Sequence, residues 1–194
     1  MLFNLQKPAA LRYRGRRGRH YSQPHVKLRK ISSYVKLISP SVDTISAEKN
    51  PFDNTISVLV GIGSTDGAAI KFPLAQCSDG TVKWIALLTK VITSDQGFSI
   101  EEPENFLHPN VQKEFINLVR TESRHNDNLP YTLITTHSES LLNEADPSEV
   151  ILVWMDDGRT IVKRVSNASQ LSDEINRTGF GLGYYYTSGA LEGA

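Results

Sequence analysis

Three carboxylates follow a short apolar segment in the middle of the chain. Gly97 to Ile100 is predicted to be a short buried strand, and Glu101, Glu102 and Glu104 come at its carboxyl end. Burying this much negative charge is costly unless a cation lies nearby. Mg²⁺ with a bound nucleotide supplies such a cation, and phosphoryl-transfer enzymes hold it with acids at strand ends. A solvated acidic turn, favoured by the dipole of a following helix, is the simpler interpretation.

Two other segments place polar groups beside a predicted helix or strand. Ser78 and Asp79 are both good caps for a helix that begins there. One face of that helix is expected to carry Val82, Ile85, Ala86, Thr89 and Ile92. His137 follows an apolar strand predicted at Tyr131 to Thr135. Each of these features alone is commonly structural, because Ser-Asp-Gly is an ordinary cap and a histidine after a strand is often a core residue.

The joint order of these segments resembles ABC-type ATPase heads of the group that includes RecF, SMC and OLD nucleases, with their smaller AAA-type bacterial relatives. SIEEPENFLHP resembles the Walker B and D-loop stretch of that group, and CSDGT upstream of it is similar to the ABC signature. TLITTHS resembles the strand that ends in the switch histidine, and GFGLGYYYTSGALEG is like the tail of the AAA-type relatives.

The resemblance implies roles for the residues of the acidic stretch and of the histidine strand. Glu101 would hold Mg²⁺ through water, and Glu102 would polarise the water that attacks the nucleotide. Leu107 and His108, with the proline that follows them, would form the D-loop that crosses to a second head. His137 would contact the γ-phosphate of ATP.

The resemblance also implies a site shared between two subunits. Ser78, Asp79, Gly80 and Thr81 would hold the γ-phosphate of ATP bound to the opposite subunit, through the serine and the backbone amides of a helix N-terminus. The implied cofactors are ATP and Mg²⁺, and the implied partner is a second ATPase head, in a homodimer or with an intact paralogue.

The chain departs from that family at the phosphate-binding loop. ATP binding in that family depends on a Walker A loop, G-x-x-x-x-G-K-S/T. The sequence of 194 residues contains no segment with this pattern. The pair Gly61 and Gly63 lies in a strand-turn-strand context, which favours a hairpin. We therefore expect the carboxyl-terminal half of a head, which binds ATP weakly and hydrolyses it negligibly without a complementary half.

The surrounding elements indicate an α/β fold. Helices are expected from His25 to Ile38, after Pro109 and from Ser138 to Asn143, and hairpins within Thr55 to Leu74, around Ser64 to Gly67, and within Val150 to Val165. The strand and helix order from Gly97 onward predicts a mostly parallel sheet with an antiparallel hairpin, as in a partial P-loop NTPase-like ABC head.

Charge is distributed unevenly along the chain. The first 42 residues carry 10 Lys or Arg and no acid, whereas the rest carry 11 bases and all 21 acids. Residues 1–24 are predicted to be a basic, disordered arm and residues 25–194 the partial head. The arm could bind DNA phosphates, act as an Arg-rich targeting segment, or be a solvated tail.

Composition limits the remaining function classes. Cys77 is the single cysteine, which excludes an intramolecular disulfide. No apolar run reaches the roughly 20 residues that cross a bilayer, so we expect a cytoplasmic protein without a membrane partner. Besides an ATPase module, a non-enzymatic dimerisation or nucleic-acid-binding module stays open. A metal hydrolase would use Glu101, Glu102, Glu104, His108 and His137, although the H-E-x-x-H spacing is absent.

Overall fold

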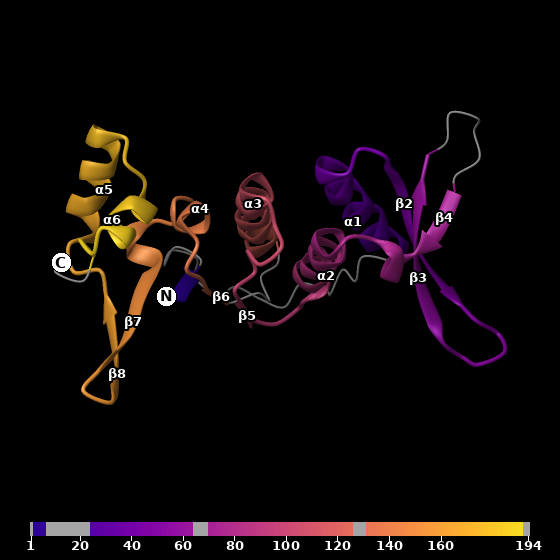
Figure 1. Cartoon of the computed structure of the whole chain (residues 1–194), viewed down its shortest axis with the longest axis horizontal. Helices are drawn as coiled ribbons and strands as arrows, with labels where there is room; N and C mark the ends of the chain where they lie inside the picture. Colours follow the sequence, from indigo (N-terminus) through magenta and orange to yellow (C-terminus); the bar gives the residue numbers. More distant parts are fainter. Residues whose placement is uncertain (1, 7–23, 64–69, 126–130, 192–194) are drawn as a thin grey trace, which may run out of the picture. The chain divides into compact units, whose positions relative to one another are not determined.

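In the computed structural model the chain divides into two compact units. The larger unit combines Met1–Ala9 with Ser94–Ala194, and the smaller unit is Ala10–Thr93 (Figure 1). The structure describes residues 2–6, 24–63, 70–125 and 131–191. No helix within these residues has the length and the apolar character needed to cross a membrane.

The smaller unit is a three-stranded antiparallel sheet with two helices. Its elements are α1 (Pro24–Ile38), β2 (Val42–Lys49), β3 (Ile56–Ile62), β4 (Ile70–Pro73), a short 3₁₀ turn at Leu74–Gln76 and α2 (Asp79–Thr93). The strand order is β2-β3-β4. The helix expected from His25 and the hairpin formed by β3 and β4 are confirmed, while the turn expected at Ser64 to Gly67 lies outside the described residues. Strand β2 was not predicted, because its buried positions, Val42 and Ile45, do not alternate with polar ones.

The buried face of helix α2 is rotated from the predicted one. Ala86 and Thr89 are exposed, whereas Trp84, Leu88 and Val91 are buried. The indole Nε1 of Trp84 donates a hydrogen bond to the backbone oxygen of Tyr34 in α1, at 3.3 Å. Trp84 and Leu88 remove more apolar surface from water than Ala86 and Thr89 would, and this difference sets the rotation of the helix.

The larger unit is a five-stranded sheet with helices. Its elements are β1 (Leu2–Gln6), β5 (Phe98–Glu101), α3 (Pro109–His125), β6 (Tyr131–Thr135), α4 (Glu139–Leu142), a 3₁₀ turn at Pro147–Glu149, β7 (Val150–Asp156), β8 (Arg159–Arg164), α5 (Ala168–Thr178) and α6 (Leu182–Thr187). The order across the sheet is β5-β6-β1-β7-β8. Strands β5 and β6 are parallel neighbours, as predicted, and their register runs from Phe98 opposite Thr132 to Glu101 opposite Thr135.

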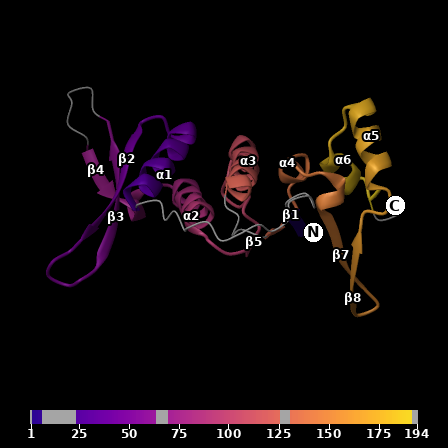
Figure 2. The same ribbon diagram turned by 180° about the vertical axis from the view of Figure 1, so that it is seen from behind.

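Strand β1 occupies a central position in this sheet. It lies between β6 and β7 and is antiparallel to both. Figure 2 labels it near the amino terminus, between β5 and β7. All five of its residues pair with β6, whereas Leu2 and Phe3 alone pair with β7. From the sequence, Leu2–Gln6 was expected to be part of the basic arm, because five residues are too few to show a clear period. The insertion of β1 also separates β6 from β7, so β5 and β6 form the one parallel pair among the described strands. The five-stranded sheet is therefore mostly antiparallel and not mostly parallel as predicted.

The turns and the final helices are local features of the larger unit. The predicted hairpin of β7 and β8 is confirmed, and its turn has φ of 43° at Asp157 and 74° at Gly158. Positive φ at both positions suits the right-handed twist of paired strands. Helix α5 ends at Gly179, which adopts a left-handed conformation with φ of 76°. Helices α5 and α6 were not predicted from the sequence.

The helix expected after Pro109 is confirmed as α3, and it fixes the position of the loop that precedes it. Val111, Phe115, Leu118 and Val119 are buried, as their spacing indicated. Leu141 and Leu142 of α4 are fully buried as well. The residues that follow β5 and β6 are therefore attached to a packed core.

The central position of β1 predicts that its backbone N–H groups contribute to stability. Hydrogen-bonded and non-hydrogen-bonded pairs alternate along an antiparallel ladder, so one of Asn4 and Leu5 donates its N–H to β6. We expect one of the variants Asn4→Pro and Leu5→Pro to lose about 1–3 kcal/mol more unfolding free energy than the other, because it leaves a β6 carbonyl unpaired. Urea denaturation of both variants checks this, and two unfolding curves identical to that of the unaltered chain would contradict the placement of β1.

Candidate functional site

The acidic stretch forms an exposed turn directly after β5. Glu101 ends the strand, and both Glu101 and Glu102 are exposed to solvent. Glu102 has a φ of 41°, and its backbone N–H donates to the backbone oxygen of Thr135 at 2.9 Å. Its carboxylate accepts a hydrogen bond from the Asn105 side-chain amide at 2.9 Å. The expectation that buried charge requires a cation here is therefore wrong for Glu101 and Glu102, because solvent can stabilise both carboxylates.

Glu104 is the acid of this stretch that the fold encloses. One carboxylate oxygen, Oε1, accepts hydrogen bonds from the Thr136 hydroxyl at 2.5 Å and from the backbone N–H of His137 at 3.1 Å. The other oxygen, Oε2, is buried without a hydrogen-bond partner among the described residues. Thr136 is itself fully buried. Glu104 thus fastens the acidic turn to the residues that follow β6, a role that its position in the sequence did not indicate.

His137 lies at the carboxyl end of β6, next to the acidic turn. Its side chain is exposed, and its Nδ1 lies 2.9 Å from the hydroxyl oxygen of Tyr186 in α6. Ser138 caps α4 by accepting a hydrogen bond from the backbone N–H of Leu141. The structure therefore brings Glu101, Glu102 and His137 to the ends of two neighbouring parallel strands. Tyr186 was missed, because no local pattern connects it with a residue 49 positions earlier.

The segment expected to form the D-loop is partly buried. The Leu107 side chain is 8% exposed, and its backbone oxygen accepts from the Gln112 side chain at 2.9 Å. Gln112 in turn accepts from the Ser138 hydroxyl at 2.7 Å. His108 is exposed, and Phe106, with φ of 67°, is 73% exposed. The side chains of Phe106 and His108 can therefore contact another molecule at this loop, whereas the side chain of Leu107 is buried.

The signature-like residues belong to the smaller unit. Ser78 accepts a hydrogen bond from the backbone N–H of Thr81 at 3.3 Å, and the two hydroxyl oxygens lie 3.0 Å apart. The predicted cap at the start of α2 is confirmed. Ser78 and Asp79 are exposed, and Gly80 and Thr81 are half-buried. Burial raises the pKa of the neighbouring Cys77 thiol, which keeps it protonated and poorly nucleophilic at neutral pH.

The exposed carboxylates fit one kind of magnesium site. Within the described residues no group of three or more His, Cys, Asp or Glu side chains is arranged to hold a metal ion. Mg²⁺ commonly keeps several waters and binds one or two carboxylates together with substrate phosphates. Glu101 can supply such an oxygen, through water, to an ion that arrives with a nucleotide, and Glu102 stays available beside it.

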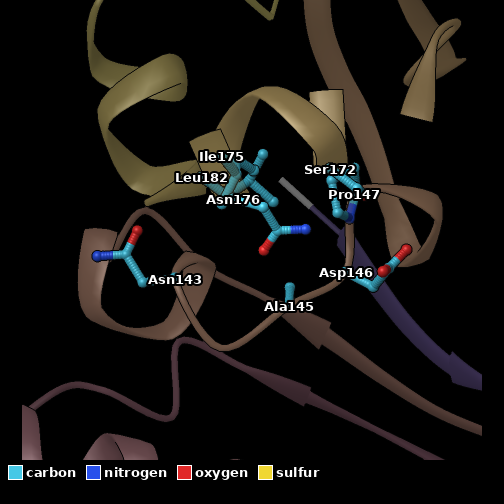
Figure 3. Close-up of a pocket in the computed structure, with 8 residues that line it drawn as sticks. All are labelled: Asn143, Ala145, Asp146, Pro147, Ser172, Ile175, Asn176 and Leu182. Atoms are coloured by element: carbon cyan, nitrogen blue, oxygen red, sulfur yellow. The ribbon is translucent and has the colours of Figure 1, made fainter. Parts of the chain in front are cut away.

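A small cavity lies elsewhere in the larger unit. It has a volume of about 170 Å³ and is formed by the connection from α4 to β7 together with α5 and the start of α6 (Figure 3). Its lining residues are Asn143, Ala145, Asp146, Pro147, Ser172, Ile175, Asn176 and Leu182. None of the site residues expected from the sequence lines this cavity, so it does not extend the site at the strand ends.

Sequence comparison identifies relatives of the chain. A family described as "AAA domain, putative AbiEii toxin, Type IV TA system" matches residues 3–143. An uncharacterized protein of Methanocaldococcus jannaschii is 33% identical over 85 residues, which are 43% of this chain and 21% of that protein. The chain thus aligns with about a fifth of the length of that relative.

Structural comparison finds similar folds among SMC proteins. A structure described as "Structural biochemistry of ATP-driven dimerization and DNA stimulated activation of SMC ATPases" has a TM-score of 0.54 and 16% identity, covering 81% of this chain and 94% of that one. The Smc head domain of Pyrococcus yayanosii has a TM-score of 0.55 and 17% identity, covering 78% and 29%. The Smc head domain of Pyrococcus furiosus, bound to a domain of ScpA, has a TM-score of 0.54 and 16% identity, covering 78% and 38%. These similarities confirm the predicted α/β, P-loop NTPase-like fold.

The hydrogen bonds of Glu104 predict a larger contribution to stability than those of the exposed acids. In Glu104→Ala the Thr136 hydroxyl and the His137 N–H lose their acceptor, and we expect unfolding free energy to fall by about 1.5–3 kcal/mol. Glu101→Ala is the matched control in the same turn and should change stability by about 0.5 kcal/mol or less, because its side chain is exposed. Chemical denaturation followed by fluorescence measures both, and equal effects would show that Glu104 does not fasten the turn.

Proposed function

The chain belongs to the AAA-domain family described as "AAA domain, putative AbiEii toxin, Type IV TA system", and we propose that it is the part of an ATPase head that performs ATP hydrolysis. It acts with a complementary half that carries the Walker A loop and captures the nucleotide. Both the family and the fold support an ATPase module, and an ATPase binds a nucleotide, typically with Mg²⁺. We also propose that, within this class, the chain is related to RecF and OLD nucleases.

The observation that carries this proposal is the connection between the acidic turn and the histidine. Glu102 donates its backbone N–H to Thr135, and Glu104 accepts from Thr136 and from the backbone of His137. These hydrogen bonds hold a carboxylate and an imidazole at adjacent strand ends while leaving both side chains exposed. Ligands of open α/β sheets bind outside the carboxyl ends of the strands. A triphosphate at this edge would meet both groups.

Each residue then has a distinct task in the reaction. Glu102 orients the attacking water and accepts its proton, and Glu101 would hold Mg²⁺ through water. His137 donates a hydrogen bond to the γ-phosphate. Mg²⁺, when bound with ATP, neutralises the charge that develops on the phosphate oxygens. Catalysis in such a site comes mainly from positioning and from electrostatic stabilisation.

The second head completes the proposed site. Ser78, Asp79, Gly80 and Thr81 stand at the start of α2, where a helix N-terminus favours an anion. We place them against the γ-phosphate of ATP bound to the opposite head, and we place His108 and the backbone of Leu107 in the loop that crosses to it. The relation to a structure described as showing ATP-driven dimerization of SMC ATPases supports a paired arrangement, either of two copies or with an intact paralogue.

The proposal is tested by trapping ATP in a head assembled from this chain and a Walker A half. Glu102→Gln should retain bound ATP while turnover falls by roughly 10²- to 10⁴-fold, because the amide cannot accept the proton of the attacking water. Glu174→Gln replaces an exposed glutamate of α5 and should hydrolyse ATP normally. Phosphate release and the nucleotide retained after gel filtration are measured, with the chain alone as background. Hydrolysis by Glu102→Gln at the rate of the control would remove Glu102 from this role.

A second candidate function follows from the charge of the amino-terminal arm. Residues 1–24 hold six of the 10 Lys and Arg of the first 42 residues and no acid, a composition that attracts nucleic acid phosphates. In this alternative the chain is a non-enzymatic module that pairs with an intact ATPase or binds DNA through its arm. Arginines 12 to 19 lie outside the described residues, so this alternative is supported by the sequence alone.

Substitution of the arm's arginines tests the DNA-binding alternative. We expect a variant with Gln at Arg12, Arg14, Arg16, Arg17 and Arg19 to bind duplex DNA more weakly. The slope of log affinity against log salt should become shallower by about 0.9 for each phosphate that the arm no longer neutralises. A variant with Gln at Arg159 and Arg177, which are exposed outside the arm, is the control and should keep the original slope. Fluorescence anisotropy at several salt concentrations measures both, and an unchanged slope in the arm variant would show that the arm does not bind phosphates.

A further inference from the structure

The side chain of His137 forms a hydrogen bond with a residue of α6, the last helix among the described residues. Its Nδ1 lies 2.9 Å from the hydroxyl oxygen of Tyr186. The ring centroids are 6.5 Å apart and the planes are tilted by 37°, so the rings meet through this hydrogen bond rather than by stacking. The backbone of His137 is held separately by Glu104. Glu104 thus holds the backbone of His137, and Tyr186 contacts its imidazole ring.

Helix α6, which carries Tyr186, is attached to α4 by close contacts. The backbone N–H of Gly183 donates to the side-chain oxygen of Asn143 at 2.7 Å. A Cβ added at Gly183 would lie 2.8 Å from the Cα, the Cβ and the backbone oxygen of Glu139, so no larger residue fits. Leu182 and Tyr185, on either side of these contacts, are buried. The position of the Tyr186 hydroxyl is therefore set by packing rather than by a free chain end.

The hydrogen bond to Nδ1 has a chemical consequence at the other ring nitrogen. A neutral imidazole carries one N–H and one acceptor nitrogen, and the partner of one nitrogen determines the state of the other. A tyrosine hydroxyl can either donate to an unprotonated Nδ1 or accept from an Nδ1–H group, so this contact fits either tautomer. If the hydroxyl donates to Nδ1, the proton of His137 resides on Nε2. An Nε2–H group is the form that can donate to a phosphate oxygen.

We propose that Tyr186 is a positioning residue that holds His137 as the Nε2–H tautomer and orients its ring toward the phosphate. This inference rests on the proposed function for its use in catalysis, but the tautomer itself is a property of the chain alone. Among the described residues, Nδ1 of His137 is the hydrogen-bond partner of the Tyr186 hydroxyl, at 2.9 Å, and the proposal assigns the hydroxyl as the donor. The closing sequence of the chain thereby contributes a residue to the site that begins at β5 and β6.

The tautomer can be measured directly by long-range ¹H–¹⁵N NMR of the full chain labelled with ¹⁵N-histidine. A His137→Asn variant identifies the signals, and His108, whose Nδ1 accepts from the Asn110 backbone, is an internal reference. In the unaltered chain we expect Nδ1 of His137 to give an acceptor-type signal and Nε2 a protonated one. Tyr186→Phe should move both signals toward an average of the two tautomers. Tyr184→Phe, at an exposed tyrosine on the same helix, should leave them unchanged.

Two results would overturn the inference. One is the detection by NMR of a proton on Nδ1 of His137 in the unaltered chain. This measurement does not depend on the folding of any variant. The other is a set of His137 signals that Tyr186→Phe does not shift.

ATP turnover by the head assembled from this chain and a Walker A half distinguishes a failure of this inference from a failure of the proposed function. Tyr186→Phe should lower kcat about tenfold with little change in KM. The imidazole ring of His137 loses its orientation in this variant, whereas the binding site for the nucleotide is unchanged. If His137→Ala leaves turnover unchanged, the proposed role of His137 fails, while the NMR result still decides whether Tyr186 sets its tautomer. If His137→Ala slows turnover and Tyr186→Phe does not, the positioning role of Tyr186 is refuted.

Discussion

The site at the strand ends depends on the carboxylate of Glu104. Its Oε1 accepts from Thr136 and from the backbone of His137, while the residues around it leave Oε2 enclosed. A half-buried carboxylate is stabilised by such donors, and hydrogen bonds to a charged acceptor are stronger than those between neutral groups. This interaction joins two loops that are 32 residues apart in sequence. It adds a side-chain connection to the backbone alignment that the β5–β6 ladder and the Glu102 N–H provide.

The same arrangement explains why the exposed groups are available for chemistry. Glu101 and Glu102 face solvent, and the carboxylate of Glu102 accepts a hydrogen bond from Asn105 within its own turn. The enclosed acid positions the turn, and the exposed acids can meet a ligand. A similar division holds for the histidine, whose backbone is fixed by Glu104 and whose ring is reached by Tyr186. The geometry therefore separates residues that support the site from residues that could react.

Strand β1 shows how a sheet can include a segment from far away in sequence. It completes the hydrogen bonding of β6 through five residues and pairs with β7 through two. Because it runs antiparallel to both, β6 and β7 keep the same direction without being neighbours. An unpaired strand edge would expose backbone groups, and β1 covers the β6 edge. The basic sequence that follows β1 belongs to the arm on which the DNA-binding alternative depends.

Much of the architecture was determined by the sequence itself. Helical spacing predicted α1 and α3, the Ser78 and Ser138 positions predicted helix starts, and the turn residues Asp157 and Gly158 predicted the β7–β8 hairpin. These signals are local, because periodicity and caps act within a few residues. The order of the signature-like segment, the acidic stretch and the histidine strand likewise indicated the ATPase-head fold by resemblance.

The tertiary structure alone decided the features that depend on distant segments. The insertion of β1, the rotation of α2 toward Trp84, the enclosure of Glu104 and the contact of Tyr186 with His137 each join residues that no local pattern connects. Local sequence preferences are short-range, whereas packing selects among faces and partners by the total area buried and by the hydrogen bonds satisfied. For that reason the motifs could be recognised from the sequence, whereas the residues that hold them in place could not.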